Sequence, residues 1–381
     1  MIITKEQIEA VLRYRLNELP VTSLYLDVDP AKNPKEEYMI SVKSLIHKGR
    51  NRLEKNRLSR EGHQSVIEDF EKISSYVSSL KGHDFKALAL FSSSRNNFFQ
   101  TYHLDETVKD RIIVDHVPYT KPLLALLRQK KRYIALLLKK DRLRAFEVYG
   151  NRIKEELDFF TNSNFSSRSN AYIFINERKI MNRKETELNR FLREASDEAL
   201  HLLMKSEADY IVLGGDEKIR QLFHESMHPY LRERFAGFTT IPFNAKEKDV
   251  LEAVKIASAE RLRQLDQELV NRLHGELSRD GCACKGLNMV LEALSMAAVS
   301  VLAVEEGYSC PGYIDRSNGF LYTEESKPSG GGDELLPLSD VVNEAVDEAI
   351  HQGADVRIIK DPLLMEGLDH IAALLRFRCS E

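Results

Sequence analysis

The stretch Gly286–Gly307 constrains the fold of this chain more than any other segment. Its first half places apolar residues at spacings of three and four, as one face of a helix does: Leu287, Val290, Leu291, Leu294 and Ala298. Its second half, Ser300–Val304, is a short apolar run followed by Glu305-Glu306-Gly307, which indicates a buried strand. A helix that leads directly into a buried strand is a unit of an α/β fold.

A second helix–strand unit follows towards the C-terminus. Residues 338–352 have a helical pattern that stops at Gly353, and residues 354–359 indicate a strand. Asp361-Pro362 interrupts the chain, and the apolar segment Gly367–Arg376 is predicted to form a closing helix. Residues 280–381 are therefore predicted to form a small α/β/α sandwich.

These C-terminal segments resemble a known family. ALSMAAVSVLAVEEGY and the terminal QGADVRIIKDPLLMEGLDHIAALLRF are similar to the C-terminal domain of archaeo-eukaryotic class 1 peptide-chain release factors and their relative Pelota. Glu366-Gly367 precedes Ile371–Phe377, in the order of that family. The resemblance extends from Arg132 to the end and is strongest to the bacterial and archaeal relatives of these factors. It implies a C-terminal domain of the kink-turn RNA-binding ribosomal-protein type.

Length and composition limit the domain number and the class of protein. A chain of 381 residues is too long for one ordinary core, so we predict three α/β domains, at 1–120, 130–275 and 280–381. No apolar run approaches the length of a membrane span, the N-terminus has no apolar signal core, and four cysteines suit a reducing compartment. We therefore expect a cytoplasmic protein without a membrane partner.

The N-terminal segment combines predicted strands with a basic helical stretch. Residues 23–29, 85–91, 97–104 and 111–117 indicate strands, and residues 38–80 are helical in pattern. The first half of that helical stretch includes Lys43, Lys48 and Arg50. Although the net charge of −4 argues against general nucleic-acid binding, a local basic face fits phosphate contacts. A solvated face partly compensated by acidic neighbours is the alternative.

The middle of the chain opens with three predicted strands, at 132–138, 142–148 and 153–159, and a long helix covers 172–205. By resemblance, this order matches the start of the middle domain of release factors, which has a ribonuclease-H-like fold. A further strand at 209–213 leads through Gly214-Gly215 to Asp216, a candidate N-cap for the next helix. Two glycines without further nucleotide-motif residues favour a structural turn over a phosphate site.

The polar segment Thr161–Asn170 lies between the third of these strands and the long helix. In the resembled family this position holds a Gly-Gly-Gln loop that assists the hydrolysis of peptidyl-tRNA. The present sequence contains no Gly-Gly-Gln, because Gly214-Gly215 is followed by Asp216 and Gly330–Gly332 by Asp333. The resemblance therefore points to other side chains of the loop, namely Asn162, Asn164 and Asn170 as amide donors and Arg168 as a contact for tRNA phosphates. Whether the chain is an enzyme stays open.

The long helix begins with a cluster of cations. They are Arg178, Lys179, Arg183 and Lys184. Contact with tRNA or ribosomal RNA is one interpretation, since the preceding loop also carries Arg168. Ordinary salt bridges with acidic residues one helical turn away are the other.

Metal and cofactor chemistry find little support in the sequence. Cys282 and Cys284 lack zinc-ribbon spacing, and His224 and His228 stand one helical turn apart without further ligands. We predict neither a metal site nor a cofactor. A nuclease would need clustered carboxylates, and the first two middle strands offer only Asp141 and Glu147.

The resemblance implies a ribosome-associated translation factor that acts in termination or in the rescue of stalled ribosomes. Ribosome and tRNA are the implied partners, and a translational GTPase is a further candidate. The alternative is a non-catalytic RNA-binding or adaptor protein on a release-factor-like scaffold.

Overall fold

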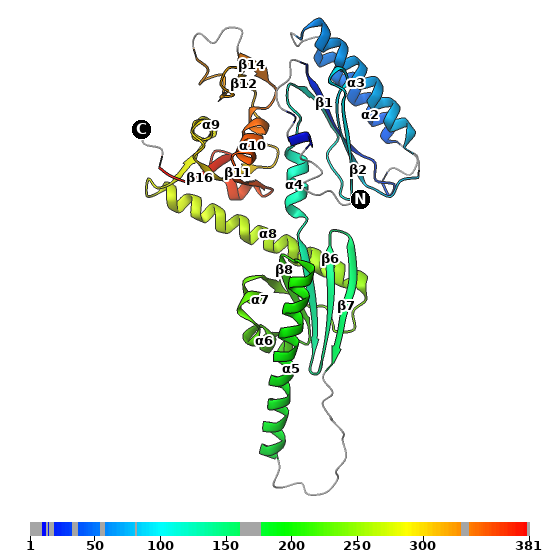
Figure 1. Cartoon of the computed structure of the whole chain (residues 1–381), viewed down its shortest axis with the longest axis vertical. Coiled ribbons are helices and arrows are strands. Elements are labelled where there is room, and N and C mark those ends of the chain that lie inside the picture. The colour runs from blue at the N-terminus through cyan, green and yellow to red at the C-terminus, as the bar shows by residue number, and fades with distance from the viewer. Residues whose placement is uncertain are drawn as a thin grey trace. The chain divides into compact units, whose positions relative to one another are not determined.

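The computed structural model describes residues 10–12, 14, 19–32, 37–53, 58–80, 82–160, 177–328 and 335–378 (Figure 1). The chain divides into two compact units, one made of Met1–Gln129 with Asp266–Glu381 and the other of Lys130–Leu265. Helices and at least one sheet occur in each unit, which confirms the mixed α/β class. The three-domain boundaries stay a prediction.

The first sheet of the larger unit is antiparallel, in the order β3-β2-β1-β4. Its strands confirm the four predicted near the N-terminus, with shifts of a few residues at their ends. They are β1 Val21–Asp27, β2 Ala87–Ser93, β3 Phe98–Leu104 and β4 Arg111–Asp115. Alternate residues of β1 face opposite sides of the sheet, as the period of a strand requires. Leu24 and Leu26 belong to one apolar cluster, and Tyr25 between them belongs to another.

Helices cover both faces of this sheet. The predicted helical stretch is two helices, α2 (Tyr38–Leu53) and α3 (Arg60–Ser79), which lie side by side and pack on the face of Leu24 (Figure 1). On the opposite face, Tyr25 packs with Leu123 of α4 (Lys121–Gln129). Burial from both sides explains why β1 and β2 are apolar over most of their length.

The second sheet has the order β10-β16-β11-β15 and is mixed. Its strands are β10 Ala283–Lys285, β11 Val299–Glu305, β15 Asp355–Ile359 and β16 Ile371–Leu375. Two helices pack on one face, α9 Leu287–Ser295 and α10 Val341–His351. Val270 and Leu273, from the last turns of α8 (Glu247–Leu277), pack on the other. The kink-turn-type fold itself stays a prediction.

The predicted closing helix at Gly367–Arg376 is wrong. The segment contains β16, which lies between β10 and β11 and pairs with both in antiparallel register. Its five apolar residues are too few to distinguish a strand from a helix by periodicity. This segment forms a strand because it lies between two other strands of a sheet that helices cover on both faces. A small sheet of β12 (Gly312–Asp315), β13 (Leu321–Tyr322) and β14 (Leu335–Leu338) completes this unit.

The smaller unit contains a five-stranded sheet in the order β7-β6-β5-β8-β9. The three predicted strands are confirmed as β5 Arg132–Lys139, β6 Arg142–Tyr149 and β7 Arg152–Phe160, an antiparallel meander. The parallel strands are β8 (Tyr210–Gly215) and β9 (Phe235–Phe238).

Helices cover both faces of this sheet as well. Three helices pack on one face, α5 Glu177–Ser206, α6 Glu217–Ser226 and α7 Pro229–Glu233. Val250 and Val254, from the first turns of α8, pack on the other face. Asp216 caps α6, as predicted, because its carboxylate accepts hydrogen bonds from the backbone of Lys218 and Ile219.

Candidate functional site

The four candidate residues of the segment Thr161–Asn170 lie outside the described residues. They are Asn162, Asn164, Arg168 and Asn170. Chain order places them after β7 and before α5, between a strand and a long helix as the sequence predicted. The backbone positions of Arg178, Lys179, Arg183 and Lys184 belong to the first turns of α5. Their roles stay predictions.

The cations Lys43, Lys48 and Arg50 of α2 are exposed. Val42 and Leu53 turn into the core of the sheet, so the same helix directs its charged side chains to solvent. Within the described ranges, none of the three cations forms an ion pair. On α3, Glu61 and Glu68 contact the guanidinium of Arg95, whereas Glu71 lines the same groove as Lys43 and Arg50. The three cations of α2 are therefore exposed and without ion pairs in the described structure.

Two surface hollows border α2, and different cations of this helix line each of them. A groove of about 390 Å³ between α2 and α3 is lined by Lys43 and Arg50. A cavity of about 710 Å³ on the other side is lined by Lys48 of α2 and Arg111 of β4. Apolar side chains and the carboxylates of Asp110 and Asp340 complete the larger cavity. The sequence pattern predicted the cations but neither hollow.

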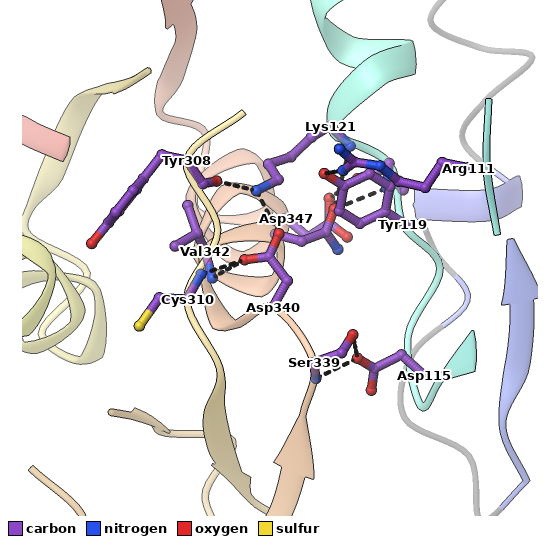
Figure 2. Close-up of polar contacts among 12 residues, drawn as sticks. Arg111, Asp115, Tyr119, Lys121, Tyr308, Cys310, Ser339, Asp340, Val342 and Asp347 are labelled. Carbon is purple, nitrogen blue, oxygen red and sulfur yellow. Dashed lines mark hydrogen bonds and ion pairs between the residues drawn. The ribbon is translucent and has the colours of Figure 1, made fainter. Parts of the chain in front are cut away.

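A buried polar network joins the segment Pro118–Lys121 to α10, and Figure 2 shows its contacts. Tyr119, Thr120 and Lys121 of this segment are buried. The Thr120 amide donates to Asn343 Oδ1 at 2.9 Å, and the Thr120 hydroxyl donates to Asp347 at 2.5 Å. Asn343 Nδ2 donates in turn to the carbonyl oxygen of Pro118 at 3.0 Å. The backbone of this segment is thus held by helix side chains.

Lys121 forms the central ion pair of the network. Its ammonium lies 2.5 Å from a carboxylate oxygen of Asp340 and donates to the carbonyl oxygen of Tyr308 at 2.7 Å. Burial lowers the pKa of Lys121, and the negative charge of Asp340 opposes that effect. Asp340 also accepts from the amides of Val342 and Cys310, so that one carboxylate caps α10 and binds the lysine.

Tyr119 and Asp115 extend these contacts on the side of the first sheet. Arg111 donates to the hydroxyl of Tyr119 at 2.6 Å, and its guanidinium carbon lies 5.2 Å from the centre of that ring. Burial raises the pKa of Tyr119 to about 12. The Asp115 carboxylate accepts hydrogen bonds from the amide and the hydroxyl of Ser339, and burial raises its pKa (Figure 2). The network is a structural junction within the larger unit.

Other candidates from the sequence serve structural roles. The ring of His224 packs on Phe235, and His228 accepts a hydrogen bond from the amide of Tyr230 at the start of α7. Within the described part of the chain, no group of three or more His, Cys, Asp or Glu side chains is arranged to hold a metal ion. The helices described there include none that is long and apolar enough to cross a membrane.

Comparisons with known proteins identify the relatives of this chain. Residues 118–259 match the model of "Bacterial archaeo-eukaryotic release factor family 10". The peptide chain release factor subunit 1 of Archaeoglobus fulgidus is 23% identical over 291 residues, which cover 68% of this chain and 69% of that protein. The match to the family model begins at Pro118, in the buried segment Pro118–Lys121, and ends within α8.

Solved structures of similar proteins include an archaeal translation termination factor, aRF1. It is 17% identical, with 98% and 99% of the two chains covered and a TM-score of 0.27. Dom34 of S. cerevisiae is 12% identical, with 82% and 79% covered and a TM-score of 0.42. At these TM-scores the identification rests on the two sequence matches. The chain is thus similar to release factors, over residues 118–259 by the family model and over 68% of its length by the archaeal relative.

Proposed function

We propose that this protein is a ribosome-associated translation factor that acts in termination or in the rescue of stalled ribosomes. The match of residues 118–259 to a release-factor family model is the observation that carries the proposal. The curated relative from Archaeoglobus fulgidus is itself a peptide chain release factor subunit. A tRNA and a translational GTPase are expected as further partners, by resemblance.

The exposed cations of α2 support contact with RNA. Lys43, Lys48 and Arg50 are free of ion pairs in the described structure, so binding a phosphate would not require breaking a salt bridge. On α5, Arg178 and Lys179 stand close in sequence to the loop that carries Arg168. We expect both groups of cations to contact ribosomal RNA or tRNA, each through phosphates and without sequence preference.

We also propose that the protein assists the release of the peptide from peptidyl-tRNA. By resemblance, the segment between β7 and α5 corresponds to the position of Gly-Gly-Gln in release factors, and its amide side chains are Asn162, Asn164 and Asn170. An amide side chain can orient an attacking water by hydrogen bonding, which is the role the glutamine has in the resembled family. Arg168 would stabilise the phosphates of the tRNA end.

The absence of Gly-Gly-Gln favours a second candidate, a non-catalytic factor that binds RNA or recruits other proteins. The two candidates differ in one measurement. Purified protein is added to ribosomes with peptidyl-tRNA in the P site and an empty A site, and released peptide is counted alongside bound protein. A catalytic factor binds and releases peptide, and a non-catalytic one binds without release.

Loop variants assign the chemistry if release occurs. Arg168→Ala and Asn170→Ala are expected to lower the release rate at least tenfold while binding persists. The matched controls are Arg190→Ala and Asn189→Ala, exposed residues of the same types on α5. Equal losses in the loop variants and the controls would reject the loop as the site of release, and failure to bind ribosomes at all would reject the whole proposal.

A further inference from the structure

The outer edge of the five-stranded sheet carries an aromatic and cationic surface that no function described above uses. Strand β9 is the edge strand, since it pairs with β8 and ends the strand order. Phe238 at its end is 45% exposed, and Tyr230 of the neighbouring α7 is 37% exposed. We call this area the β9-edge surface, made of Arg220, His224, Tyr230, Arg232, Arg234, Phe235 and Phe238.

Three rings of the β9-edge surface contact one another. The ring centres of His224 and Phe235 are 4.4 Å apart, and those of Phe235 and Phe238 are 4.9 Å apart. His224 also meets Phe238 edge-on at 5.5 Å. Because each ring is held by the next, the exposed ring of Phe238 is fixed before any partner arrives. Binding on it would therefore cost little side-chain entropy.

Arginines lie against the two exposed rings. The guanidinium carbon of Arg220 is 5.4 Å from the ring centre of Phe238, and that of Arg234 is 3.7 Å from the ring centre of Tyr230. The side chain of Arg232 donates to the carbonyl oxygen of Glu225 at 2.7 Å. Such contacts hold a guanidinium in place without neutralising its charge.

Where the structure describes the chain, the arginines of this surface are not held in salt bridges. Over the described residues, none of Arg220, Arg232 and Arg234 forms an ion pair with an acidic side chain. The exposed acids nearest in sequence, Glu225 and Glu233, make no ion pair either. Burial and the positive charge of Arg232 both lower the pKa of His224. The surface therefore combines fixed ring faces with guanidinium groups that form no ion pair in the described structure.

We propose that the β9-edge surface binds a single-stranded stretch of RNA, with unpaired bases stacked on Phe238 and Tyr230 and neighbouring phosphates on the arginines. Every base has a face that can stack on an aromatic ring, so this mode needs no sequence preference. A protein partner fits less well, since it would have to supply matching carboxylates for three partly or fully exposed arginines. The inference does not rest on ribosome binding, because the surface is expected to hold free RNA.

The absence of tryptophan from the chain allows a direct test. The Phe238→Trp variant of the full chain places one indole on the proposed platform, and oligouridine is titrated while its fluorescence is followed. Stacking of a base on the indole is expected to quench the emission strongly and saturably. The matched control is Phe320→Trp, at a position that is 40% exposed in the other unit, and it is expected to change little.

Affinity measurements then identify the groups that bind. With labelled oligouridine, Phe238→Ala and Tyr230→Ala are each expected to weaken binding at least fivefold, as loss of one stacked base does. Phe238→Tyr keeps the ring and is expected to keep the affinity, and RNA duplex of the same length is expected to bind more weakly than the single strand.

Three results would overturn the proposal. They are an unquenched Phe238→Trp variant, equal affinity of the two alanine variants and the parent chain, and equal affinity for duplex and single strand. These outcomes are independent of ribosome sedimentation. If the protein binds oligouridine at this surface but does not bind ribosomes, only the proposed ribosomal function is rejected. If it binds ribosomes but not oligouridine, only the proposed role of the β9-edge surface is rejected.

Discussion

The ammonium of Lys121 lies 2.5 Å from a carboxylate oxygen of Asp340, and their side chains are only 8% and 6% exposed. These residues are distant in sequence, and the pair joins the segment after the first sheet to the N-terminus of α10. Because an isolated buried charge is costly, each residue makes the other acceptable in the interior. The pair thus fixes where the N-terminal segment meets the C-terminal sheet within the larger unit.

Removing the lysine should therefore destabilise this unit. Lys121→Met leaves the Asp340 carboxylate buried without its partner, and the expected loss is about 3 to 5 kcal/mol in the free energy of unfolding. Lys32→Met is the control, because the ion pair of Lys32 with Asp27 is at the surface and should cost less than about 1 kcal/mol. Urea unfolding measures both variants. Similar small losses would show that the buried pair does not hold the unit together.

The double variant Lys121→Met/Asp340→Asn tests the reason for that loss. An asparagine can still cap α10 but carries no charge. Stability is expected to recover partly relative to Lys121→Met alone. A double variant that is less stable than the single one would contradict the electrostatic explanation.

Asn343 forms hydrogen bonds with the backbone of the buried segment Pro118–Lys121. Asn343→Ala leaves the carbonyl oxygen of Pro118 and the amide of Thr120 without their partners, at an expected cost of about 2 to 4 kcal/mol. Hydrogen exchange of the Thr120 amide should become faster in this variant. The exposed Asn189→Ala serves as control and should change stability by less than about 0.5 kcal/mol. Unchanged exchange at Thr120 would reject the role given to Asn343.

Tyr119 gives the larger unit a dependence on alkaline pH. Burial raises its pKa from 10.0 to about 12, so the native state keeps the phenol proton over a range in which the unfolded state loses it. This stabilisation is complete below pH 10 and is lost as pH rises to about 12, in total about 3 kcal/mol at roughly 1.4 kcal/mol per pKa unit. The measurement is unfolding at several alkaline pH values for the parent chain and Tyr119→Phe. If both lose stability equally over this range, Tyr119 is not responsible.

Gly215 is a position where the backbone itself excludes a side chain. Its φ is +90°, and an added Cβ would overlap the backbone of Leu138 on the neighbouring strand β5. Gly215→Ala is expected to cost more than about 3 kcal/mol. Gly150 has a φ of +59° with open space around it, so Gly150→Ala isolates the conformational part, about 1 kcal/mol. Equal stability of the two variants, compared by thermal unfolding, would refute the close contact.

The basic face of α2 makes a prediction about salt. Lys43→Ala and Arg50→Ala should each weaken ribosome binding about two- to tenfold at low salt, and should reduce the slope of log affinity against log salt by about 1. Lys72→Ala changes an exposed lysine of α3 and is the control. Slopes equal to that of the parent chain would place α2 outside the RNA interface.

Some of this fold could be predicted from the sequence, and the reasons are local. Strands such as β5 and helices such as α10 are fixed by their own apolar period, and the structure confirms them. β16 was missed because its five apolar residues carry no period and its pairing with β11 is a long-range contact. Whether such a short apolar run forms a strand or a helix therefore depends on the sheet around it.

The polar network shows the same limit for the site. Pro118–Lys121 has the composition of a linker, and its residue types do not indicate that it is buried. A signal did exist in its partner, because Asn343 and Asp347 stand one helical turn apart among the apolar residues of α10. Polar side chains at that spacing on a buried face need hydrogen-bond partners from another segment. The cations of α2 were predictable, but the β9-edge surface depends on the neighbours of an edge strand.

By resemblance to release factors, we expect this protein to bind ribosomes at an empty A site, in the place that a tRNA would take. The most direct measurement compares its co-sedimentation with ribosomes whose A site is empty and with ribosomes whose A site is filled by aminoacyl-tRNA. The account predicts binding to the first and strongly reduced binding to the second. Equal binding to both, or no binding at any salt or magnesium concentration, would contradict it.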